Sequence, residues 1–189
     1  MDFHETFSPV VKAAIMRLVL GVAVSCGWAL RQLDVLNAFL HGFLKEEVYM
    51  RQASGYVDST HPDFVCKLHK SLYGLKQAPR AWFKRFASYL LHLGFIASMV
   101  DSSLFIFCSA KTIIYLLLYV DDIIVIGNDA FQVQYLITAL GQVFELQYLG
   151  PLNYFLGIQI TQSSYGLTLT QTVCLGCTSQ ISYGEFKTY

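Results

Sequence analysis

The chain has 189 residues, of which 54% are hydrophobic and 15% aromatic. This composition suffices for a packed core and excludes an intrinsically disordered polypeptide, so we predict one domain or part of one. The formal net charge is zero, which excludes a protein that binds polyanions through its overall field.

The cysteines do not suggest a disulfide framework, because their number is odd and most stand alone among apolar residues. No secretory signal precedes them, so we expect an intracellular protein, cytoplasmic or nuclear, rather than a secreted one. The apolar stretch 18–30 follows Arg17 and is too short to span a membrane. We therefore expect no membrane partner.

In chain order, the first predicted element is a helix with Ser8 as N-cap and Pro9 at its first position, ending near Ser25. A strand is expected to end just after Asp34, with a turn or short helix behind it. The predicted strands of this half, rich in aromatic and β-branched residues, cover 28–35, 48–50 and 64–68.

The clearest amphipathic element is a predicted helix from Arg80 to about Leu93, which Gly94 ends. Its apolar residues recur at helical spacing and are Trp82, Phe83, Phe86, Tyr89, Leu90 and Leu93. Further predicted strands cover 104–108, 113–119, 123–126, 154–160 and 167–169, with a helix over 129–144.

Asp121 and Asp122 stand between two of the most apolar runs of the chain, which predicts a hairpin of buried strands with both acids at its tip. An ordinary polar turn explains them, because Asp is common in turns. A cation site is the other explanation, since buried carboxylates otherwise take up protons and hard divalent ions prefer carboxylate oxygens.

Asp34 is the third acid of this candidate site, because adjacent strands of one sheet would bring it to the Asp pair. Three converging carboxylates repel one another without cations. They suit two divalent ions roughly 3.5–4 Å apart, the arrangement that supports phosphoryl displacement. Mg²⁺ fits, since it takes few carboxylates and fills its other positions with water and phosphate oxygens.

A local basic patch occupies a segment without acids between Asp63 and Asp101. Its residues are Lys67, Lys70, Lys76, Arg80, Lys84 and Arg85. Such a patch is the usual form of a nucleic-acid contact surface. A solvated helix face explains the same charges.

Four sequence blocks resemble the reverse transcriptase of copia-type retrotransposons in order and spacing. They are QLDVLNAFLHG at 32–42, SLYGLKQAPR at 71–80, YVDD at 119–122 and YFLGI at 154–158. The resemblance implies an α+β polymerase palm over residues 1–171, with a small antiparallel sheet and helices packed on one face. It also implies RNA-directed DNA polymerase activity.

The resemblance implies roles for single residues. Asp34, Asp121 and Asp122 would be catalytic, and two Mg²⁺ or Mn²⁺ ions would be held by Asp34, Val35, Asp121 and Asp122. The nucleotide side would comprise Phe39, Gln77 and Arg80, where the Phe39 ring would clash with a ribose 2′-OH. Core packing explains the bulk of Phe39 as well. The primer and template side would comprise Tyr119, Val120, Lys76, Lys84 and Gly157.

The implied partners are a primed RNA or DNA template, deoxynucleoside triphosphates and the remainder of a Pol polyprotein. Three departures argue for a degenerate fragment that is inactive alone. Gln147-Tyr148 replace the family's Lys-Asp, and we expect the basic fingers hairpin and the thumb to be missing. The alternatives are a non-catalytic nucleic-acid-binding remnant and a translated transposon relic.

Residues 172–189 do not fit the family. Codons can be chosen for this stretch that, read one base later, encode the amphipathic helix and Asn-Ser-Lys-Pro that the family has there. We infer a frameshift near Thr172, which makes the Cys174 and Cys177 pair accidental rather than half of a zinc site. A poorly ordered tail without a regular element is expected, because its Gly and Ser residues disfavour a helix.

Overall fold

The structure is a computed structural model that describes residues 11–152, 154–155, 158–163, 166–172 and 180–187. The helices within these ranges are α1 (Ala13–Ser25), α2 (Ala78–His92) and α3 (Ala130–Gly141), together with the short 3₁₀ helix η1 (Ala38–His41). Ser8 and Pro9, the expected start of the first helix, lie outside the described residues. A continuous helix from Pro9 is nevertheless wrong, because Lys12 has an extended backbone as the N-cap and α1 begins at Ala13.

The main sheet is antiparallel and has the strand order β4-β5-β6-β7-β1-β8. Its strands are β1 (Ala29–Val35), β4 (Ile96–Ala97), β5 (Leu104–Cys108), β6 (Ile113–Tyr119), β7 (Asp122–Gly127) and β8 (Leu146–Pro151). The sequence predicted β1, β5, β6 and β7 closely but did not predict β8, whose residues lack a clear alternation of apolar and polar types.

Alternating side chains give the main sheet two apolar faces. On one face Leu33, Leu116 and Val125 share a core with residues of α2 and α3. On the other face Leu30, Leu117 and Ile124 share a core with residues of α1. The expected α+β class is therefore confirmed. The one-face arrangement holds for α2 and α3, whereas α1 covers the second face because that face is equally apolar.

The helix α2 follows the predicted amphipathic pattern. Trp82, Phe86 and Leu90 are buried at spacings of four residues, which places them on one side of the helix. The helix begins at Ala78, two residues before the predicted start at Arg80, with a proline in its first turn. Its buried side packs on the same core as Phe144, which follows α3.

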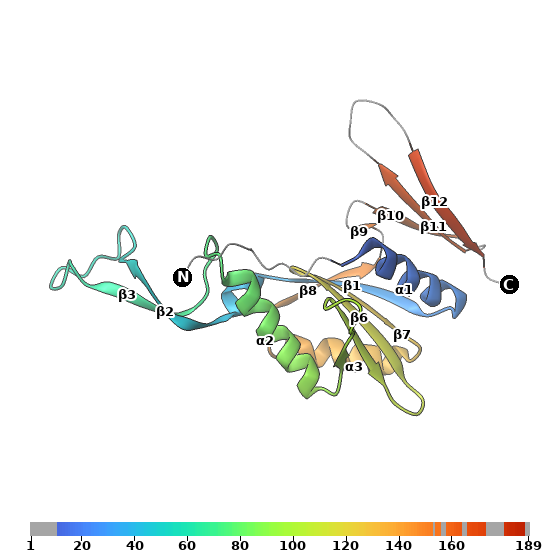
Figure 1. Cartoon of the computed structure of the whole chain (residues 1–189), viewed down its shortest axis with the longest axis horizontal. Helices are drawn as coiled ribbons and strands as arrows, with labels where there is room; N and C mark the ends of the chain where they lie inside the picture. The colour runs from blue at the N-terminus through green and yellow to red at the C-terminus, as the bar shows by residue number, and fades with distance from the viewer. Residues whose placement is uncertain (1–10, 153, 156–157, 164–165, 173–179, 188–189) are drawn as a thin grey trace.

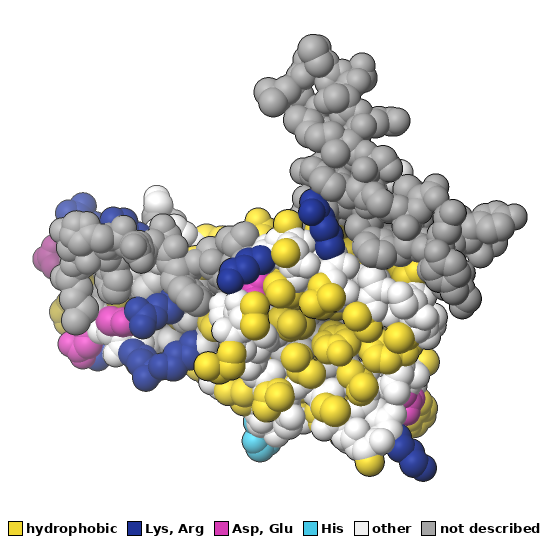
Figure 2. All heavy atoms as spheres, turned by 45° about the vertical axis from the view of Figure 1, so that its right-hand side comes forward, with side chains coloured by type: hydrophobic (Ala, Val, Ile, Leu, Met, Phe, Trp, Pro, Cys, Tyr) yellow, Lys and Arg dark blue, Asp and Glu magenta, His cyan; other side chains and the backbone are white. Residues whose placement is uncertain are grey.

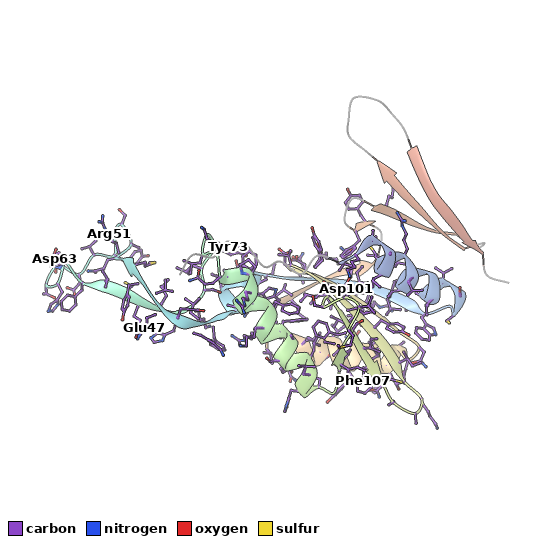
Figure 3. The ribbon with its side chains drawn as sticks, in the orientation of Figure 1. Glu47, Arg51, Asp63, Tyr73, Asp101 and Phe107 are labelled. Atoms are coloured by element: carbon purple, nitrogen blue, oxygen red, sulfur yellow. The ribbon has the colours of Figure 1, made fainter. Side chains whose placement is uncertain are left out.

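A two-stranded ribbon, β2 (Phe43–Arg51) and β3 (Val65–Lys70), projects from the body (Figure 1). Glu47, Arg51 and Asp63 lie along it, away from the main sheet (Figure 3). Neither strand contributes a residue to the two core clusters. The ribbon is therefore stabilised mainly by its own pairing and by its attachment at the base of α2.

A second antiparallel sheet has the order β12-β11-β10-β9. Its strands are β9 (Tyr154–Phe155), β10 (Ile158–Ser163), β11 (Gly166–Thr172) and β12 (Gln180–Lys187). The predicted hairpin of β10 and β11 is confirmed. The single strand predicted over 154–160 is wrong, because β9 and β10 divide this segment and pair with each other antiparallel. The expectation that the tail forms no regular element is wrong for 180–187, because β11 offers an unpaired edge to a segment containing Ile181, Tyr183 and Phe186. Cys174 and Cys177 lie outside the described residues.

Within the described part of the chain, no helix is long and apolar enough to cross a membrane. Three cysteines of that part, Cys26, Cys66 and Cys108, are exposed free thiols.

Candidate active site

The three candidate acids come from two neighbouring central strands. Asp34 on β1 is the direct cross-strand partner of Asp122 on β7, so both side chains leave the same face of the sheet. Tyr119 pairs with Asp122, which leaves Val120 and Asp121 as a two-residue turn. The backbone N–H of Val35 donates to the carbonyl of Asp121 at 2.9 Å. The hairpin tip and the end of β1 are thus joined at the site.

The turn itself has an uncommon backbone. Val120 has a φ of 57°, a left-handed conformation that branching at Cβ makes unfavourable. Its carbonyl accepts a hydrogen bond of 2.6 Å from the indole Nε1 of Trp82 on α2. This turn is therefore held by an element on the far side of the sheet from the Asp34 and Asp122 carboxyls.

The electrostatics of the site favour protonation. Burial, and then the charge of Asp121, raises the pKa of the Asp34 carboxyl above its ordinary value. Burial raises the pKa of Asp122 as well, with the charges of Asp121 and Asp34 adding to the effect. A hydrogen bond of 3.5 Å from Gln32 Nε2 to Asp122 Oδ1 acts in the opposite direction. A nearby cation would relieve this repulsion.

The donor set suits a hard divalent cation, because carboxylate oxygens on one face are what such ions prefer. The cluster is not preassembled, however. Across the described residues, no three His, Cys, Asp or Glu side chains are grouped closely enough to hold a metal ion. The backbones of Asp34 and Asp122 are adjacent, and Asp121 lies in the adjoining turn.

Phe39 lies in η1, immediately beyond the strand that carries Asp34. Its ring is half-buried against the α2 and α3 core and lies 5.2 Å from the ring of Tyr73, centroid to centroid. Its carbonyl accepts a hydrogen bond from the Ser71 hydroxyl. Core packing and a place beside a bound sugar are both compatible with this position.

The remaining nucleotide-side residues, Gln77 and Arg80, lie around the start of α2, as do the template-side residues Lys76 and Lys84. Gln77 is its N-cap residue and is half-buried, whereas Lys76 and Arg80 are exposed. Lys84 lies close enough to Lys45 of β2 that the second ammonium lowers the pKa of the first. Several lysine and arginine side chains gather at the ribbon end of the molecule, and hydrophobic side chains gather over the middle of the body (Figure 2).

Two members of the predicted basic patch are engaged elsewhere. Lys67 forms an ion pair with Glu47 on the ribbon. The Arg85 guanidinium donates to the carbonyl of His41 at 2.6 Å and lies 4.4 Å from the Phe43 ring centroid. Arg85 therefore fastens the end of η1 to α2.

Gln147 on β8 is the direct cross-strand partner of Asp34 on its other side. Gln147, which stands where the family usually carries a lysine, thus lies beside Asp34. On the hairpin, the ring of Tyr119 makes an edge contact with Phe155 at 6.2 Å. Gly157, which was assigned to the primer side, lies outside the described residues.

Two residues at the site were not predicted from the sequence to act there. Gln32 was seen only as part of a motif, and its contact with Asp122 follows from strand alternation two residues before Asp34. Trp82 was predicted only as part of the apolar side of α2. No sequence signal could have shown that its indole N–H reaches the turn.

A family model described as reverse transcriptase (RNA-dependent DNA polymerase) matches residues 1–180. The chain belongs to the reverse transcriptase family. It is 51% identical over 171 residues to a retrovirus-related Pol polyprotein from transposon RE2 of Arabidopsis thaliana. The Pol polyprotein from transposon RE1 of the same plant is 50% identical over 171 residues, and that of TNT 1-94 of Nicotiana tabacum is 42% identical over 163 residues.

These alignments cover 86–90% of this chain but only 12% of each of the three polyproteins. The expected resemblance to copia-type reverse transcriptases is confirmed. Reverse transcriptases act on nucleic-acid templates and generally use divalent metal ions. No solved structure matches the chain. The family match extends past residue 171, the expected end of the resemblance.

Proposed function

We propose that residues 1–171 are the palm region of a retrotransposon RNA-directed DNA polymerase, which adds deoxynucleotides to a primer on an RNA or DNA template. The observation that carries this proposal is the pairing of Asp34 with Asp122 across β1 and β7, with Asp121 in the adjoining turn. This pairing is independent of the motif order along the chain, because the register of β1 against β7 alone places Asp34 opposite Asp122.

In this proposal Asp34, Asp121 and Asp122, with the backbone of Val35, hold two Mg²⁺ or Mn²⁺ ions. Such ions activate an attacking hydroxyl and neutralise a leaving phosphate when they are bound. The primer 3′-oxygen forms the new bond to the α-phosphorus of the nucleotide, and pyrophosphate leaves. The acids of the chain orient the reacting groups, and the raised pKa values of Asp34 and Asp122 support a role that requires a cation partner.

The other assignments rest on the family resemblance. Phe39, backed by Tyr73, would lie under the sugar of the nucleotide, with Gln77 and Arg80 beside it. Lys76 and Lys84 would contact the template. Tyr119, Val120 and Gly157 would contact the primer end.

The chain spans about an eighth of the length of the three plant Pol polyproteins it matches, at 12% coverage of each. We therefore propose that the region works within a larger Pol polyprotein and is inactive or weakly active alone. The missing lysine at Gln147 adds to this expectation. Residues 172–189 remain our proposed frameshifted tail, and the genomic nucleotide sequence across Thr172 tests that proposal directly.

Primer extension tests the enzymatic proposal. The full chain is incubated with a primed RNA template, deoxynucleotides and Mg²⁺ or Mn²⁺, beside Asp121→Asn. We expect weak binding of the ions and little or no extension by the isolated chain. Extension in the presence of supplied flanking Pol segments, lost in Asp121→Asn, supports the proposal. Extension that survives in Asp121→Asn contradicts it.

A non-catalytic nucleic-acid-binding remnant is the second candidate. The crowding of Lys84 against Lys45, with Arg80 nearby, favours it, because phosphate groups would relieve that repulsion. Binding that falls steeply with salt, is weakened in Lys84→Glu and never leads to extension selects this candidate. The matched control is Lys111→Glu, in the β5–β6 loop.

A further inference from the structure

The carbonyls of the two turn residues are bonded to two different elements. The Val120 carbonyl accepts from Trp82 Nε1 of α2 at 2.6 Å, and the Asp121 carbonyl accepts from Val35 N–H of β1 at 2.9 Å. The left-handed φ of 57° at Val120 is costly for a β-branched residue and persists only where the surroundings fix it. The indole hydrogen bond is one such constraint.

We propose that Trp82 is a positioning residue of the candidate active site. Its indole N–H fixes the turn at Val120, and through the turn it sets the directions of the Asp121 and Asp122 carboxyls relative to Asp34. The role differs from core packing because it depends on one N–H group, not on the volume of the ring.

The Trp82 ring is held firmly enough to act in this way. It is 1% exposed, and it contacts the rings of Phe86, Phe144 and His41 at centroid distances of 5.2, 5.4 and 5.9 Å. These aromatic contacts restrict its rotation. The backbone of Trp82 is also closely packed against Gly42. A Cβ added at Gly42 would lie only 2.8 Å from the backbone nitrogen of Trp82. The packing around the ring and the backbone therefore fixes the orientation of the indole N–H toward the turn.

The same helix carries Arg80 and Lys84 and has Gln77 as its N-cap residue, and all three are proposed nucleotide or template residues. The Trp82 bond thus links that side of the molecule to the hairpin that carries Asp121 and Asp122. A shift of α2 would be transmitted to the acids through one hydrogen bond. This part of the inference, and any effect on metal binding, rests on the proposed function.

The test separates the N–H from the ring. In the full chain, Trp82→Phe removes the donor, and 3-benzothienylalanine at position 82 replaces the N–H by sulfur with little change in volume. The control is Trp28→Phe. Trp28 stacks on Tyr115 at 6.1 Å, next to the end of β1 where Ala29 pairs with Gly127, far from the turn. Amide hydrogen exchange at Val35 and in the turn is followed by NMR.

Loss of the donor should accelerate exchange at Val35 by about fivefold, the effect of one hydrogen bond, and leave β5 unchanged. Trp28→Phe should leave Val35 unchanged. Removing the donor should accelerate exchange at Val35 less in a Val120→Gly background, because glycine adopts a positive φ without steric cost. Unchanged exchange with benzothienylalanine, or equal effects in the wild-type and Val120→Gly backgrounds, would overturn the proposal.

Mn²⁺ titration in the same samples separates this inference from the proposed function. Paramagnetic broadening near Asp122 should require more Mn²⁺ when the donor is lost. If the turn loosens as expected but Mn²⁺ causes no broadening even in the wild-type chain, the positioning of the turn stands and the metal-dependent function fails.

Discussion

At the scale of single residues, the acids of the site act against stability when they carry charge. Burial and mutual repulsion raise the pKa values of Asp34 and Asp122 in the folded chain. In the unfolded chain both carboxyls return to the ordinary value of 3.8. As pH rises above that value, the unfolded state loses its protons first. The free energy of unfolding therefore falls until the pH exceeds the raised folded pKa.

We expect Asp34→Asn to be more stable than the wild type at pH 7 in EDTA, by roughly 0.5 kcal/mol after allowance for solvent screening. The difference should vanish near pH 3, where both carboxyls are protonated in the wild type. Urea denaturation at both pH values measures it. Asp63→Asn on the ribbon is the control and should show no such pH-dependent gain. Equal stability of Asp34→Asn and wild type at pH 7 would contradict the prediction.

Gln147 gives a second prediction at this scale, because it lies directly opposite Asp34. Gln147→Lys places a cation there, which favours the charged carboxylate. The Asp34 carboxyl should then titrate at a lower pH in a ¹³C NMR experiment. Gln134→Lys, on the exposed side of α3, is the matched control and should leave the titration unchanged. An unaltered Asp34 titration in Gln147→Lys would show that the two side chains do not interact.

At the scale of elements, pairing and burial separate the centre of the main sheet from the tail. β7 is paired on both sides, with β6 and β1, and its residues from Ile123 to Gly127 are buried. β12 lies at the edge of the second sheet, is paired with β11 alone and contains Gly184, which weakens a strand.

Amide hydrogen exchange should therefore be slowest in β7 and much faster in β12. The same experiment in a chain truncated after Thr172 should leave β7 protection nearly unchanged if the tail is dispensable, as a frameshifted tail would be. Protection of β12 equal to that of β7 would show instead that the tail belongs to the cooperative core.

At the scale of the whole molecule, the ribbon and the body have different sources of stability. The body has two cores, one on each face of the main sheet. The ribbon adds no residue to either core, and it extends away from the sheet (Figure 1). The body should therefore fold without the ribbon's distal part.

Replacing residues 47–67 by a short Gly-Ser turn should change the free energy of unfolding of the body by less than about 0.5 kcal/mol, the usual range for changes outside a core. Circular dichroism during urea denaturation measures this. Leu136→Ala in α3, a buried residue of the first core, is the positive control and should cost about 2–5 kcal/mol. Loss of cooperative unfolding without the ribbon would mean that it supports the body.

The sequence by itself determined what depends on local pattern. Continuous apolar runs of strand length predicted β6 and β7, helical spacing predicted α2, and the motif blocks predicted the family and the candidate acids. These signals are local because each residue's direction follows from its own element's period. Strands without such a pattern, β8 above all, were missed.

Only the tertiary structure decided which residues meet. The register of β1 against β7 set Asp34 opposite Asp122, and that of β1 against β8 set Gln147 beside Asp34. Packing of α2 against the sheet placed the Trp82 indole within hydrogen-bonding distance of the Val120 carbonyl. Pairing with the edge of β11 made residues 180–187 of the tail the strand β12. Register and packing sum many contacts between residues distant in the chain, so no single stretch of sequence encodes them.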